Sequence, residues 1–126
     1  MPDAEIIRAT VAQYLARHSA GDIDGIAACF SADAEVEDPV GTQRHRGTEE
    51  IRAFFSGTHD LCDSMRLDLT GPIRVVGPHA AFPMTAHTRI GEMTVEVDII
   101  DVMLFDESGR IREMYAYWDF ADARTS

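Results

Sequence analysis

The sequence predicts an α+β domain in which N-terminal helices pack on a curved, largely antiparallel (mixed) sheet that encloses an apolar pocket. Three observations lead to this prediction. Apolar residues recur at helical spacing only in the first half of the chain. From about residue 65 onward they alternate with polar residues, as in strands that bury one face. Glycine-containing turns separate these alternating segments, as the hairpins of a meander require.

The composition is that of a single domain spanning residues 1–126. Hydrophobic residues make up 45% and charged residues 26% of the chain, as in ordinary globular proteins. The formal net charge of -11 repels phosphate and anionic lipid, so we expect neither nucleic acid nor a membrane as partner. Cys29 and Cys62 form no paired motif, and the first residues do not resemble an export signal. These features predict a cytoplasmic protein with reduced thiols.

The first predicted helix lies between Asp3, a typical N-cap, and Gly21, a typical stop. Its buried stripe follows helical spacing and includes Tyr14. The other members of the stripe are Ile7, Val11, Leu15 and His18. A buried phenol needs a hydrogen-bond partner. Tyr14 is therefore either a core residue bonded to a carbonyl or a phenol directed into a pocket.

Two further helices are predicted before the sheet. Asp22 is placed to cap a short helix over residues 23–30, and Thr48 to cap a helix over residues 49–59. The third helix buries a cluster that includes Phe55.

A short strand over residues 34–37 separates these helices and ends at Asp38. The following Pro39 favours an extended backbone at Asp38, and the nearby glycine predicts a turn. A carboxylate at the junction of a strand and a turn suits a general base. The same position also suits an ordinary turn residue.

The remaining chain is predicted to form an antiparallel meander. Its strands are expected at residues 65–70, 73–76, 81–90, 94–105 and 110–120. Because Pro83 cannot donate to a ladder, a bulge or an edge is predicted there. We expect five large side chains to contact an apolar ligand in the enclosed pocket: Phe55, Phe82, Met84, Met103 and Trp118.

An aspartate interrupts the apolar face of the strand over residues 94–105. That face carries Val95, Val97, Ile99, Asp101, Met103 and Phe105. Desolvation would raise the pKa of Asp101 and keep it protonated, and a protonated carboxyl can donate a hydrogen bond. The alternatives are a bulge at this position or a salt bridge to an arginine.

Several kinds of chemistry have no motif in this chain. The five histidines show no metal-ligand spacing, no glycine-rich phosphate loop follows a strand, and no nucleophile elbow is present. Two carboxylates in contrasting settings, Asp38 and Asp101, and the phenol of Tyr14 are the candidate catalytic residues.

These three residues and their surroundings resemble the ketosteroid isomerase family of the NTF2-like superfamily. The matching segments are VAQYLARHSAGDIDGIAACF, EVEDPVGTQRHRGTEEIRAFF and the IID that ends at Asp101. The resemblance implies a conical NTF2-like fold, a homodimer and a deep apolar pocket. It also implies an isomerase that converts Δ5-3-oxosteroids to Δ4-3-oxosteroids without cofactor or metal.

Carried over by residue, the resemblance makes Asp38 the general base that moves a proton from C4 to C6, and we expect it to keep an ordinary pKa. Tyr14 and Asp101 would form the oxyanion hole for the oxygen at C3. Phe55 and Phe30 stand where some family members have further tyrosines, so a shorter phenol network is implied.

Two other functions remain open at this point. One is a non-catalytic protein that binds a steroid or another apolar molecule. The other is a different NTF2-like enzyme, either a SnoaL-like cyclase or an epoxide hydrolase.

Overall fold

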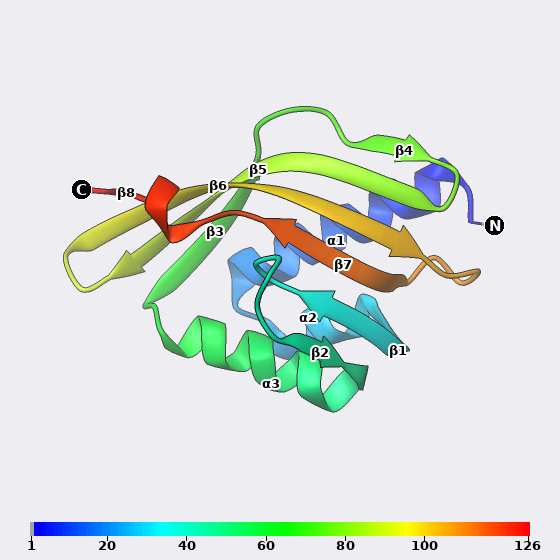
Figure 1. Ribbon diagram of the computed structural model, residues 1–126, viewed down its shortest axis with the longest axis horizontal. Coiled ribbons are helices and arrows are strands. Elements are labelled where there is room, and N and C mark those ends of the chain that lie inside the picture. The colour runs from blue at the N-terminus through cyan, green and yellow to red at the C-terminus, as the bar shows by residue number, and fades with distance from the viewer. Residues whose placement is uncertain (1) are drawn as a thin grey trace.

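In the computed structural model, which describes residues 2–126, three helices pack on one face of a curved mixed sheet (Figure 1). The helices are α1 (Ala4–Ala20), α2 (Ile23–Ala28) and α3 (Gly47–Asp60). The strands are β1 (Phe30–Glu37), β2 (Arg44–Arg46), β3 (Ser64–Leu69), β4 (Arg74–Val76), β5 (His79–Ile90), β6 (Met93–Phe105), β7 (Ile111–Tyr117) and β8 (Arg124–Thr125). A short 3-10 helix, η1 (Phe120–Asp122), precedes β8. The predicted NTF2-like α+β fold is confirmed.

The strand order is β2-β1-β7-β6-β5-β3, with β4 added beside β5 and β8 beside β6. β1 and β7 run parallel, and the other neighbours are antiparallel. The parallel contact brings the end of β1, and Asp38 after it, next to the end of β7. The peptide bond between Asp38 and Pro39 is cis.

The first two predicted helix starts are confirmed, and the third is wrong. Asp3 accepts a hydrogen bond from the backbone N–H of Ile6, and Asp22 accepts one from that of Gly25. α3, however, begins at Gly47, and its N-cap Arg46 makes no side-chain cap hydrogen bond. Because β2 leads directly into α3, Thr48 lies inside the first turn of the helix and does not cap it.

Several element boundaries also differ from the prediction. The second helix ends at Ala28, and Phe30 begins β1 because it pairs with Ile111 of β7. The last long strand ends at Tyr117, so Trp118 lies in the segment that follows it. The short strands β2 and β8 were not predicted, since two or three polar residues carry no alternation.

The proline in β5 lies where the strand changes its neighbour. β4 pairs with residues 79–81 of β5, and β3 pairs with residues 84–89. Pro83, with no N–H to donate, lies between these two ladders, and its carbonyl accepts from the N–H of Thr70 (3.1 Å). No bulge is present, because the β5–β6 ladder is regular through Pro83; the predicted edge is confirmed only locally, on the side of β5 where neither β3 nor β4 pairs with Pro83.

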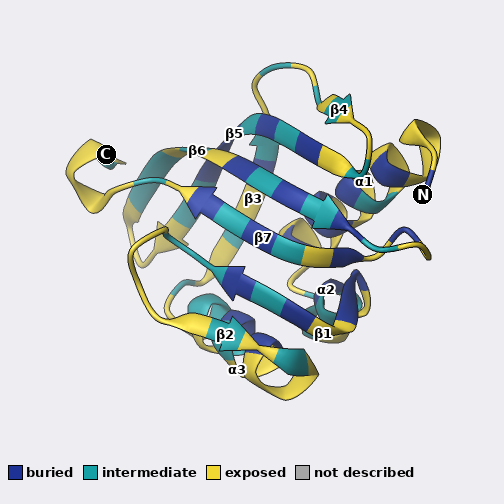
Figure 2. Ribbon diagram, turned by 45° about the vertical axis from the view of Figure 1, so that its right-hand side comes forward, coloured by how far each residue is buried: buried dark blue, intermediate teal, exposed yellow. Residues whose placement is uncertain are grey.

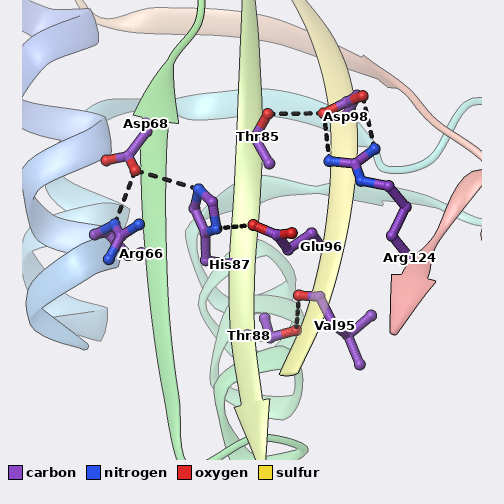
Figure 3. A network of polar contacts seen from close by, with 9 residues as sticks. All are labelled: Arg66, Asp68, Thr85, His87, Thr88, Val95, Glu96, Asp98 and Arg124. Carbon is purple, nitrogen blue, oxygen red and sulfur yellow. Dashed lines mark hydrogen bonds and ion pairs between the residues drawn. The ribbon is translucent and has the colours of Figure 1, made fainter. Parts of the chain in front are cut away.

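Polar side chains cover the outer face of the sheet across β3, β5 and β6 (Figure 3). Thr85 donates to Asp98 (2.7 Å), and Arg124 of β8 binds the same carboxylate through two nitrogens (2.9 and 3.2 Å). His87 lies between carboxylates of the two neighbouring strands. Because side chains alternate across a strand, the residues between these polar ones face the helices.

The inner face of the sheet and the helices bury the core, and the strands alternate between buried and more exposed positions (Figure 2). On β6 the predicted face is confirmed, since Asp101, Met103 and Phe105 are all buried. Within residues 2–126, no helix is both long enough and apolar enough to cross a membrane.

Candidate active site

A cavity of about 380 Å³ lies between the helices and the inner face of the sheet. Its walls come from α1, α3, β3, β5 and β6, and from the segments after β1 and β7. Most of the lining side chains are apolar. Tyr14, Asp38 and His18 are the ionisable residues of interest among them. A cavity of this size and character fits a small apolar ligand with a few fixed polar contacts.

Tyr14 reaches this cavity from the buried stripe of α1 and is 2% exposed. The rings of Phe30 and Phe55 pack edge-on against it, with centroids 6.0 and 6.3 Å away. Burial chiefly raises the pKa of Tyr14 well above its ordinary value, and ionisation of Asp101 or Asp38 would raise it further. The phenol therefore keeps its proton and can act as a hydrogen-bond donor.

Asp101 lies next along the same face of β6 from the cavity-lining Ile99, but it is not itself among the residues that line the cavity. Its neighbours in register are Phe82 on β5 and Ala116 on β7, both buried. Asp101 is itself 0% exposed, and neither carboxyl oxygen has a hydrogen-bond partner among the described residues. Burial, and then repulsion by Asp38, raise the pKa of Asp101 well above its ordinary value.

The structure shows neither alternative that the sequence left open for Asp101. The β6 ladder is regular through this position, so no bulge turns the side chain away. No arginine among the described residues binds the carboxyl. A protonated carboxyl is the form that such a site favours, because an ionised one would lose hydration without compensation.

Asp38 follows β1 and lines the cavity. The turn after it is held to β7, because the N–H of Val40 donates to the carbonyl of Ala116 (2.8 Å). The indole Nε1–H of Trp118 donates to Asp38 Oδ1 (2.7 Å). Burial raises the pKa of Asp38, and this indole hydrogen bond and the nearby His45 oppose the increase. The expectation of an ordinary pKa at Asp38 is therefore not met.

Replacing Trp118 with phenylalanine should raise the pKa of Asp38 further. The variant keeps an aromatic wall but loses the N–H that stabilises the ionised carboxylate. We expect ¹³C NMR titration of the Asp38 carboxyl to show the upward shift. Tyr117→Phe, which alters a half-exposed neighbour, is the control and should leave the titration unchanged. An unchanged pKa in Trp118→Phe would contradict the assigned hydrogen bond.

The five residues predicted to contact a ligand divide into two groups. Phe55, Met84 and Trp118 line the cavity. Phe82 and Met103 are buried in the core, 1% and 0% exposed, and are not among the cavity-lining residues described. Both lie on the faces predicted for them, beside Asp101, but deeper than the cavity wall.

Sequence reasoning missed a pair of histidines, one of which, His18, lines the cavity. His18 Nδ1 lies 3.0 Å from His59 Nε2, and the two rings stack with centroids 5.2 Å apart. The helical spacing placed His18 on the buried stripe, but nothing in the sequence connects it to His59 on α3. Among the described residues, no cluster of three or more His, Cys, Asp or Glu could hold a metal ion.

Comparison with known proteins assigns the family. The sequence matches the SnoaL-like domain over residues 11–114. The steroid Delta-isomerase of Nocardioides simplex is 38% identical over 112 residues, which cover 89% of this chain and 89% of that protein. The chain belongs to the SnoaL-like family. Its identity to the isomerase extends over most of the chain.

Other relatives of this SnoaL-like protein carry different enzyme names. The epoxide hydrolase LasB of Streptomyces lasalocidi is 24% identical over 96% of this chain, which spans half of LasB. The solved structure of SalBIII, an epoxide hydrolase/cyclase-like enzyme of pyran ring formation in salinomycin, superimposes with a TM-score of 0.87. That match covers 98% of both chains at 24% identity, so it shows the shared fold.

Proposed function

We propose that this SnoaL-like protein isomerises Δ5-3-oxosteroids to Δ4-3-oxosteroids by moving one proton within the substrate. The observation that carries the proposal is Asp101, a fully buried carboxyl whose two oxygens have no partner among the described residues. A negative charge on Asp101 would raise the pKa of the Tyr14 phenol further. The 38% identity to a steroid Delta-isomerase supports the same reaction.

Tyr14 and Asp101 suit an oxyanion hole. A proton beside a ketone is weakly acidic, so the barrier falls chiefly when negative charge on the oxygen is stabilised. The raised pKa values of Tyr14 and Asp101 favour the protonated forms, which supply two O–H donors. In a site walled by apolar side chains these donors act at low dielectric, where their effect is larger than in water.

Asp38, the third candidate residue, acts as the general base. The ionised carboxylate of Asp38 takes the proton from C4, and the electron pair of that C–H bond moves toward the oxygen at C3 to form a dienolate. Asp38 then returns the proton to C6, the ketone reforms, and the double bond now lies between C4 and C5. The hydrogen bond from Trp118 favours the ionised form of Asp38 that the first step needs.

The similarity to LasB is the observation that favours the alternative function of epoxide opening. Opening an epoxide with water requires an acid pair that holds and activates the water. Neither oxygen of Asp101 is hydrogen-bonded to any described residue, so no charged partner holds it in the ionised form. This arrangement supports proton donation to a ketone oxygen in preference to activation of water.

A direct assay separates the candidate functions. The protein is mixed with a Δ5-3-oxosteroid, and the conjugated enone of the product is followed by ultraviolet absorbance. We expect rapid conversion. Tight binding without conversion would favour the binding-protein alternative. Formation of a diol from an epoxide, with no enone from the steroid, would favour the hydrolase.

A further inference from the structure

One buried polar atom of the cavity wall has no role in the proposed reaction. Among the described residues, three buried side-chain polar atoms lack a hydrogen-bond partner: both carboxyl oxygens of Asp101 and Nε2 of His18. Buried polar atoms in folded proteins nearly always have a partner. The oxyanion hole accounts for Asp101, so His18 requires an explanation of its own.

His18 is held firmly beside the catalytic phenol. It follows Tyr14 by one turn of α1, and the two rings meet edge-on with centroids 4.6 Å apart. The ring of Phe55 also packs edge-on against that of His18, with centroids 4.9 Å apart. His18 is 3% exposed and lines the cavity. The contact from its Nδ1 to His59 Nε2 leaves Nε2 as the buried ring nitrogen without a hydrogen-bond partner among the described residues.

The histidine pair can present either a donor or an acceptor at Nε2. Burial, and then the neighbouring His59, lower the pKa of His18 to about 3, so the ring is neutral near pH 7 and carries one N–H. When His18 Nδ1–H donates to His59, Nε2 accepts a hydrogen bond. When His59 donates to Nδ1, the proton of His18 is on Nε2, which then donates. Exchange between these tautomers allows either a hydroxyl or a ketone to bind.

We propose that His18 Nε2 binds a second oxygen of the ligand, a hydroxyl or a ketone on a middle ring of the polycyclic frame. This inference rests on the proposed function, which places the reacting ketone at Tyr14. One helical turn advances about 5.4 Å, so the second oxygen lies part-way along the ligand. The end of the ligand farthest from Tyr14 would contact Leu61 and Phe120, two cavity-lining residues that are each 77% exposed. Because both side chains are apolar, we expect that end of the ligand to be apolar.

Calorimetric titration with two Δ4-3-oxosteroids tests this assignment without requiring turnover. One ligand carries a hydroxyl on ring C, and its partner lacks it. In His18→Leu we expect the affinity for the hydroxylated ligand to fall about 3- to 10-fold, the range of one neutral hydrogen bond. The affinity for the ligand without that hydroxyl should change by less than about twofold. Equal changes for both ligands would overturn the proposal.

Thr58→Val is the matched control. Thr58 also lines the cavity, but its hydroxyl already donates to the carbonyl of Phe54 (3.0 Å). Loss of the Thr58 hydroxyl should leave the ratio of the affinities for the two ligands unchanged. A change in that ratio as large as the change in His18→Leu would show that any polar wall residue has the effect, and would overturn the assignment to His18.

¹⁵N NMR of the wild-type imidazoles provides a second readout that survives if His18→Leu fails to fold. We expect the hydroxylated ligand to shift the Nε2 signal of His18, and its partner to leave that signal in place. An unmoved signal in both complexes would overturn the proposal. If the protein converts the Δ5-3-oxosteroid but His18 does not respond, only this inference fails. If it binds neither steroid, the proposed function fails as well.

Discussion

Asp38→Asn should lower kcat for isomerisation of a Δ5-3-oxosteroid by about 10²–10⁴-fold, the range lost with a general base. The amide matches the carboxylate in shape but cannot take up the C4 proton. Product affinity should remain within about threefold, because the apolar walls of the cavity are unchanged. Initial rates measured by enone absorbance and affinities measured by calorimetry test the two parts separately.

Asp68→Asn is the charge-matched control for this variant. Asp68 lies on the outer face of the sheet, where it contacts Arg66 and His87 (Figure 3), and it is not among the residues that line the cavity. Its activity should equal that of the wild type. Full activity in Asp38→Asn would remove Asp38 from the mechanism, and loss of both activity and binding would indicate a structural role.

Asp101→Leu should slow isomerisation by about 10²–10³-fold, the usual cost of removing one oxyanion donor. The same change should stabilise the fold at pH 7, because an apolar side chain replaces a buried carboxyl that has no partner. Asp101→Asn retains an N–H donor and should lose less activity than Asp101→Leu. Enone assays and urea denaturation of the three proteins test these expectations. Activity and stability that fall together would indicate that Asp101 is only a core residue.

The pH dependence of stability provides an independent test of the buried carboxyl. Since folding raises the pKa of Asp101, the folded chain keeps a proton that the unfolded chain releases above about pH 4. The contribution of this group to the free energy of unfolding is therefore complete at low pH. It falls by about 1.4 kcal/mol per pH unit until the pH passes the raised pKa.

Asp101→Asn lacks this titration. Its stability relative to the wild type should therefore increase as the pH rises above about 4, and then level off once the pH exceeds the pKa of Asp101 in the folded protein. Urea denaturation at several pH values measures the difference. A difference that does not change with pH would mean that Asp101 titrates normally in the folded state.

Local sequence patterns were enough to predict much of the fold. Helical spacing placed Tyr14 on the buried side of α1, and alternation placed Asp101 on the buried face of β6. Asp3 and Asp22 were identifiable as caps because a capping side chain binds backbone within its own first turn. Thr48 failed as a cap because the neighbouring strand β2 changes where α3 begins, and that strand has too few residues to show a pattern.

The electrostatic settings of the acids depended on contacts that no local pattern contains. Trp118 is 80 residues from Asp38 in the chain, and their hydrogen bond exists because β7 runs parallel to β1. His18 and His59 meet only because α1 and α3 flank the same cavity. Asp38 was expected to titrate normally, yet the walls that close around it raise its pKa.

Residue spacing was therefore enough to predict the α+β layout and to place two of the three candidate acids, Tyr14 and Asp101, on buried faces, because periodicity decides which side of an element a side chain occupies. It could not supply the partners of those acids or the depth at which each is buried. Desolvation and hydrogen bonding depend on which distant segments close over a group, and that is settled when the helices and the sheet pack together.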